Sequence, residues 1–168
     1  MLSPVHLHLM LNHIPVLGFP LAFVLLLFGA RRGSKDVLLA ANVLLVVATV
    51  ACLVTYFSGE GAEELIEELP GVSERLLHAH ERVALFAVIV VAFSGVLALV
   101  SLLKKGLYGS PAFTKVVSIV VVVASILLAR TAFMGGQVRH SEVRPTKAIQ
   151  GSQLTPAVSE VETIPSAQ

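Results

Sequence analysis

The uncharged segment 37–59, VLLAANVLLVVATVACLVTYFSG, decides the fold of this chain. It holds 23 consecutive residues without Lys, Arg, Asp or Glu. A helix of about 20 apolar residues crosses the hydrocarbon core of a bilayer. We therefore predict that this segment is a transmembrane helix.

Three further segments have the same character. Residues 1–30 contain no charged side chain, residues 83–103 form an uncharged run of 21 residues, and residues 116–138 contain a single charge, Arg130. We predict helical spans near 10–30, 37–58, 82–103 and 114–135. The fold class is therefore all-α, an integral membrane antiparallel four-helix bundle. It occupies residues 1–140, and residues 141–168, rich in Ser, Thr, Gln and Pro, form a disordered tail.

Composition supports this class and excludes others. Of the 168 residues, 55% are apolar and 14% are charged, with a mean hydropathy of +0.85. A soluble domain is roughly 45–50% apolar and about 25% charged, so both a water-soluble and a disordered protein are excluded. One cysteine permits neither an intramolecular disulfide nor a multi-cysteine metal cage. A net charge of +1 gives no sign of nucleic-acid binding.

The loop charges predict the orientation in the membrane. The first loop holds Arg31, Arg32 and Lys35, and the third holds Lys104, Lys105 and Lys115, whereas the middle loop, residues 60–82, has seven glutamates and two arginines. Because Lys and Arg collect in cytoplasmic loops, we expect both termini and the acidic loop on the outer side of a bacterial inner membrane. In that loop, apolar residues at helical spacing before Pro70 predict a short amphipathic surface helix.

The histidines are placed as unevenly as the charges. All six, at positions 6, 8, 13, 78, 80 and 140, fall at the outer side of the predicted spans. At 1.5 Å per residue, His13, His80 and His140 lie about 25, 34 and 36 Å from the cytoplasmic helix ends. Imidazole is a common ligand of haem iron and of metal ions. We therefore predict a cofactor site at this depth that uses these three side chains.

Two other features of the spans fit such a site. Arg130 lies about 21 Å from the cytoplasmic end of its helix, where an arginine is costly unless it has a partner such as a carboxylate or a haem propionate. Pro15 and Pro20 predict breaks in the first span. We include Arg130 among the cofactor-binding residues.

Several motifs resemble known sequences. They are His8-x-x-x-x-His13-x-Pro15-x-x-Gly18, Ser58-Gly59-Glu60-x-Ala62-Glu63-Glu64 before Pro70-Gly71-Val72, His80-Glu81, and Gly135-Gly136-x-x-Arg139-His140-x-Glu142. Over residues 5–145 the chain resembles a family of uncharacterised bacterial four-helix membrane proteins. The first motif also resembles a broader group with a His-Phe-Pro-like start, although Ile14 stands in place of the aromatic residue. That resemblance implies haem binding or partnership with electron carriers.

Three functions remain open from the sequence. The first is a haem b protein that transfers electrons, with His13 and His80 or His140 as axial ligands and quinol or a periplasmic electron carrier as partner. The second is a non-haem iron, zinc or copper site. Its candidate ligands are His8, His13, His80, His140, Glu60 and Glu81. The third is a cofactor-free accessory subunit of a membrane complex. None of the three is a stand-alone enzyme.

Overall fold

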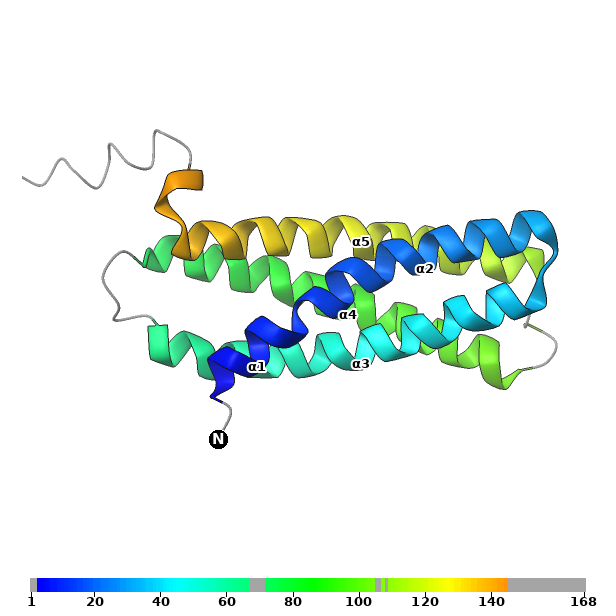
Figure 1. Cartoon of the computed structure of the whole chain (residues 1–168), viewed down its shortest axis with the longest axis horizontal. Helices are drawn as coiled ribbons and strands as arrows, with labels where there is room; N and C mark the ends of the chain where they lie inside the picture. Colours follow the sequence, from blue (N-terminus) through cyan, green and yellow to red (C-terminus); the bar gives the residue numbers. More distant parts are fainter. Residues whose placement is uncertain (1–2, 67–71, 105–106, 108, 145–168) are drawn as a thin grey trace, which may run out of the picture.

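The computed structural model describes residues 3–66, 72–104, 107 and 109–144, and every regular element in them is helical. The elements are α1 (Pro4–Leu11), α2 (His13–Arg32), α3 (Lys35–Ile66), α4 (Glu74–Leu103), α5 (Pro111–Arg139) and a short 3-10 helix (Ser141–Val143). The long helices run alternately in opposite directions and pack as a four-helix bundle (Figure 1). The predicted spans near 37–58, 82–103 and 114–135 each lie within one helix, and the span near 10–30 covers the end of α1, Asn12 and most of α2. The predicted all-helical bundle of four packed segments is therefore confirmed.

The helices have the length and surface of membrane spans. Pro4–Arg32, Lys35–Ile66, Glu74–Leu103 and Pro111–Val138 are each long and apolar enough to cross a bilayer. Large apolar side chains such as Leu17, Phe86 and Ile126 are exposed on the outside of the bundle. An apolar exterior of this extent suits lipid rather than water. These features indicate a multi-pass membrane protein.

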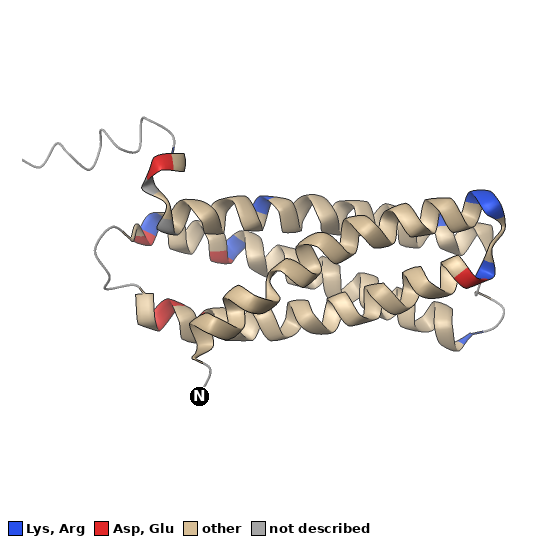
Figure 2. Ribbon diagram, viewed as in Figure 1, with Lys and Arg blue, Asp and Glu red and all other residues tan. Residues whose placement is uncertain are grey.

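The two ends of the bundle differ in character. Charged residues gather toward the ends and leave an uncharged stretch between them (Figure 2). We call one end the histidine end. It comprises α1 with the first turn of α2, the last turns of α3, the first turns of α4 and the last turns of α5 with the 3-10 helix, and it holds all six histidines. We call the opposite end, where α2 meets α3 and α4 meets α5, the basic end.

The first membrane segment bends where α1 meets α2. Asn12 separates the two helices, and Pro15 has no N–H to donate to the carbonyl of Leu11, the last residue of α1. Pro20 is accommodated inside α2 without a second break. The bend directs α1 onto α3, while α2 packs against both α3 and α5.

Packing places the four segments in a defined order around the bundle. α3 packs against α2 and α4, and α5 packs against α4 and α2. The first segment and α4 are therefore diagonally opposite, as are α3 and α5. Small residues permit close crossings: a Cβ at Gly95 would lie 2.6 Å from the Thr49 side chain, and one at Gly18 would lie 3.1 Å from Ala48 Cβ. Such residues let helix backbones approach in a membrane.

Two segments differ in detail from the sequence prediction. Residues 60–66 of the predicted amphipathic helix continue α3, because no proline interrupts the helix before Pro70; residues 67–71 lie outside the described residues. Residues 141–143 of the predicted tail form the 3-10 helix, and residues 145–168 of that tail also lie outside the described residues. The longer α3 brings its glutamates beside the start of α4.

Candidate functional site

His8 is held against α3 by a backbone hydrogen bond. Its Nδ1–H donates to the carbonyl oxygen of Thr55 at 2.9 Å, and the ring is half-buried. A Cβ at Gly59 would lie 3.2 Å from His8 Nδ1. In a helix the carbonyl of residue i points toward residue i+4, so glycine at position 59 leaves the Thr55 carbonyl open to a donor from another helix.

His80 is held against α5 in the same way. Its Nδ1–H donates to the carbonyl oxygen of Thr131 at 3.0 Å, and this ring is also half-buried. A Cβ at Gly135 would lie 3.0 Å from His80 Cε1. Thr131 and Gly135 are four residues apart, as are Thr55 and Gly59. Each histidine therefore lies on a Thr-x-x-x-Gly surface of a neighbouring helix.

These hydrogen bonds determine which ring nitrogen is available to a ligand. A carbonyl oxygen only accepts hydrogen bonds, so Nδ1 of His8 and of His80 must carry the proton. In the neutral ring, Nε2 then has a free lone pair. Each bond contributes about 1 kcal/mol, a preference of roughly fivefold for this ring orientation. The arrangement matches the usual support of a metal-bound histidine, in which Nδ1–H donates and Nε2 binds.

The two histidines belong to one region at the histidine end. Their helical segments are diagonally opposite in the bundle, and the imidazoles are near enough to interact electrostatically. Asn12, one helical turn after His8, has a buried Oδ1 that receives no hydrogen bond from any described residue. A buried polar atom without a partner is unusual in a folded protein. The two imidazoles are the donor groups that a bound ion or cofactor would meet in this region.

The structure does not bring the other predicted haem ligands to this pair. His13 is exposed, and its Nδ1–H donates to Leu9 O at 3.2 Å within its own helical segment. It follows His8 by five residues, about 140° further round a helix, which explains why the two rings face different directions. Arg130 is exposed on α5, and Glu60 is exposed on α3. Arg130 has no hydrogen-bond or ion-pair partner within the described part of the chain.

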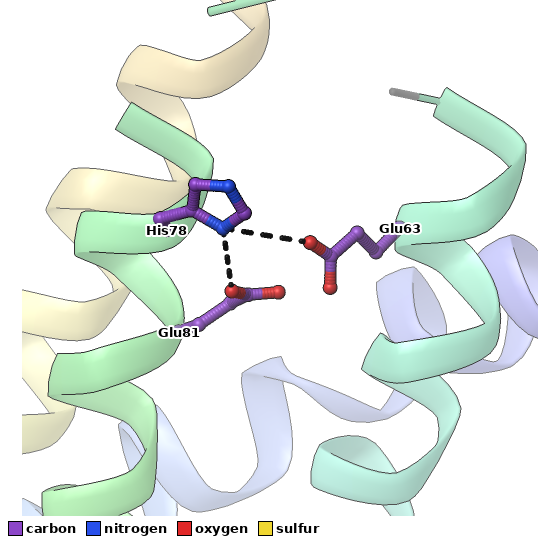
Figure 3. Close-up of side chains that lie close together, drawn as sticks. All are labelled: Glu63, His78 and Glu81. Carbon is purple, nitrogen blue, oxygen red and sulfur yellow. Dashed lines mark hydrogen bonds and ion pairs between the residues drawn. The ribbon is translucent and has the colours of Figure 1, made fainter. Parts of the chain in front are cut away.

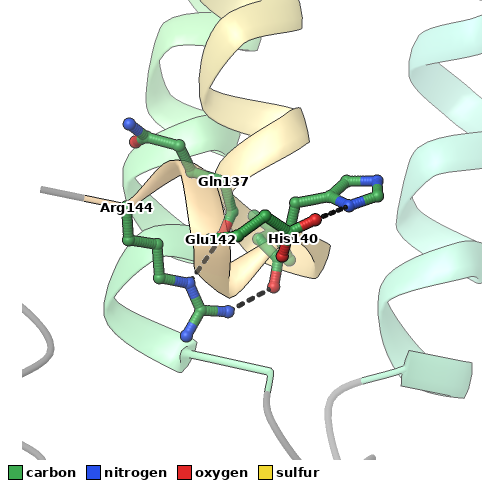
Figure 4. A network of polar contacts seen from close by, with 5 residues as sticks. Gln137, His140, Glu142 and Arg144 are labelled. Atoms are coloured by element: carbon green, nitrogen blue, oxygen red, sulfur yellow. Dashed lines mark hydrogen bonds and ion pairs between the residues drawn. The ribbon is translucent and has the colours of Figure 1, made fainter.

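His140 belongs to a separate group at the end of α5 (Figure 4). Its Nδ1 lies 2.9 Å from Glu142 Oε1, and both side chains are exposed. Arg144 donates from Nε to Gln137 O and from Nη2 to Val138 O, each at 2.8 Å. Cations satisfy the last carbonyls of a helix and interact favourably with its dipole. This group therefore caps α5.

Glu81 belongs to a third group, with Glu63 and His78 (Figure 3). His78 Nδ1 lies 3.2 Å from Glu81 Oε2 and 3.9 Å from Glu63 Oε1. One candidate ligand atom from each residue lies within 4.8 Å of the other two. His78 and His80 are two residues apart on α4 and face nearly opposite directions, so this group and the His8–His80 pair use different faces of the helix.

Sequence reasoning missed three of the residues that support the site. Thr55, Gly59 and Thr131 carry no ligand chemistry, and their role depends on which helices pack together. A signal was present in the two Thr-x-x-x-Gly spacings, each preceded by a histidine 47 or 51 residues earlier. Glu63 and His78 were missed as ligands because their convergence depends on the continuation of α3.

Comparisons with protein-family models, with curated proteins and with solved structures give no match for this chain.

Proposed function

We propose that this protein binds haem b in the membrane and transfers electrons, with His8 and His80 as the axial ligands. The observation that carries the proposal is the matched support of the two rings, in which Nδ1–H bonds to a helix carbonyl and Nε2 is left for iron. His80 keeps the role predicted from the sequence, and His8, predicted as a metal ligand, replaces His13 as its partner.

The residues of the site fit a haem in two respects. The donor set is two neutral imidazoles on diagonally opposite segments of a helical bundle, where cofactors are commonly held. Gly59 and Gly135 give each imidazole room beside its supporting helix. Haem iron would supply reversible one-electron transfer.

The chain contributes binding, orientation and insulation. The Thr55 and Thr131 carbonyls fix the planes of the two imidazoles and increase the basicity of Nε2. Core side chains next to this region, including Cys52 and Val88, are buried and exclude water. Arg130 on α5 is a cation available to an anionic group in the membrane.

The charge distribution supports an orientation for the site. With the basic end in the cytoplasm, as the positive-inside rule favours, the histidine end faces the outer side of a bacterial inner membrane. Both described ends of the chain then lie outside. The partners we propose are quinol at the outer leaflet or a periplasmic electron carrier, and the lipid bilayer surrounds the helices.

The test is an absorption spectrum of the full chain, expressed with sufficient haem and purified in detergent. We expect a Soret band in the wild type and its loss in His8→Ala and in His80→Ala. His13→Ala is the matched control, because it removes an imidazole from the same end and should keep the band. A colourless wild-type protein, or a band that survives both His8→Ala and His80→Ala, would disprove the proposal.

A further inference from the structure

A mixed group of one imidazole and two carboxylates connects α3 and α4 at the histidine end. Glu63 comes from the last turns of α3, and His78 and Glu81 come from the first turns of α4 (Figure 3). His78 and Glu81 are three residues apart, so they share one helix face. The three side chains converge, with one nitrogen and two oxygens within 4.8 Å of one another.

The two carboxylates of this group face the same imidazole nitrogen. His78 Nδ1 lies 3.2 Å from Glu81 Oε2 and 3.9 Å from Glu63 Oε1. Two carboxylates at such close range repel each other unless a proton or a cation lies between them. A metal ion held by the three side chains would interact with both carboxylates at once, and the imidazole is itself a common metal ligand.

The three side chains are exposed enough for an ion to reach them from solution. The His78 side chain is 60% exposed, whereas those of Glu81 and Glu63 are 37% and 24% exposed. The ligand atoms are thus accessible to water, while the carboxylates are partly shielded from it. One to three water molecules would complete a four- to six-coordinate shell around an ion held by three protein ligands.

We propose that Glu63, His78 and Glu81 bind a divalent transition-metal ion of the zinc or iron(II) class. One imidazole nitrogen with two carboxylate oxygens is a donor set that suits these ions better than Ca²⁺ or Mg²⁺, which prefer oxygen alone. The ion joins the end of α3 to the start of α4 across the intervening loop. This site is separate from the His8–His80 pair and goes beyond the haem proposal.

Zinc binding to the full chain in detergent tests this proposal. The protein, freed of any affinity tag and of metal by a chelator, is titrated with Zn²⁺ in a calorimeter. We expect one ion per chain in the wild type. We expect affinity to fall by about tenfold or more in Glu63→Gln, His78→Gln and Glu81→Gln, as when a metal site loses a ligand or its support.

Two control variants make the result specific. Glu64→Gln removes an exposed carboxylate next to Glu63 and should leave the affinity within about twofold, well below the tenfold loss expected for a ligand. His8→Ala removes a proposed haem ligand and should bind Zn²⁺ as the wild type does. The absence of stoichiometric binding, or equal affinity in Glu63→Gln and Glu64→Gln, would overturn the site. Zinc binding that His8→Ala abolishes and Glu63→Gln preserves would also overturn it, whatever the haem content.

Discussion

Gly135 and Gly136 are adjacent in the sequence but have different surroundings. A Cβ at Gly135 would lie 3.0 Å from His80 Cε1, whereas a Cβ at Gly136 would have no neighbouring atom within 4 Å. The first glycine allows an imidazole to rest on α5, and the second does not contact another element in this way. This difference gives a test at the scale of one methyl group.

We predict that Gly135→Ala lowers the haem content of the purified protein, while Gly136→Ala leaves it unchanged. The added methyl group displaces the His80 ring from the Thr131 carbonyl. Both substitutions raise helix propensity by about 1 kcal/mol, so a loss of haem in Gly135→Ala alone does not arise from a weaker helix. The haem-to-protein ratio measures the effect. Equal ratios in the two variants would contradict the role assigned to Gly135.

A second prediction at this scale concerns Glu142. Hydrogen bonds from its own backbone N–H and from the His140 ring lower the pKa of its carboxyl group. Its interactions therefore stabilise the folded chain above the ordinary carboxyl pKa and are lost as the pH falls through the lowered value. NMR titration should give a Glu142 pKa below the ordinary value, and His140→Ala should raise it. A Glu142 pKa that His140→Ala does not change would rule out the contribution of the ring.

At the scale of elements, the crossing of α3 and α4 depends on Gly95. A Cβ at this position would lie 2.6 Å from Oγ1 and Cγ2 of Thr49. Thr49 Oγ1 also donates to Val91 O on α4 at 3.4 Å. Because the two helices are in contact through these atoms, there is no space for an added carbon without a shift of the backbones.

We predict that Gly95→Ala lowers the free energy of unfolding by about 1–3 kcal/mol, the usual cost of overpacking. Unfolding by denaturant in detergent measures this effect, and Gly136→Ala is the control that adds the same group where space is open. Combining Gly95→Ala with Thr49→Ala should recover part of the loss. An unchanged midpoint for Gly95→Ala would mean that the crossing is wider than described.

At the scale of the whole molecule, the uneven distribution of charge predicts a topology. Ser34 lies at the basic end, and Ser73 precedes α4 at the histidine end. We predict that a membrane-impermeant maleimide labels Ser73→Cys in intact bacterial cells, and labels Ser34→Cys only after permeabilisation. The sole native cysteine, Cys52, is buried and gives little background. The opposite labelling pattern would invert the orientation and place the histidine end in the cytoplasm.

The sequence was sufficient for the spans and for the collection of histidines at one end. Uncharged runs such as 37–59 have few alternatives to membrane helices, and their lengths set the depth of each histidine. The sequence did not indicate that His8 rather than His13 should be the proposed ligand, because that proposal depends on the bend at Asn12 and on the rotation of α1 against α3. The contact of Glu63 with His78 likewise depends on how far α3 continues. A hydropathy profile predicts neither the rotation of a helix against its neighbour nor the residue at which a helix ends.

The two supporting surfaces have a consequence for assembly. His8 of α1 is hydrogen-bonded to α3, and His80 of α4 is hydrogen-bonded to α5. Each of these hydrogen bonds therefore lies within one half of the molecule. A ligand that takes one nitrogen from each ring would fasten the first half to the second. It would bind the native bundle and not the separated halves, so stability would rise with the concentration of free ligand. Cofactor supply would then act as a checkpoint in biogenesis, because chains that remain without it would be the first to unfold and to be degraded.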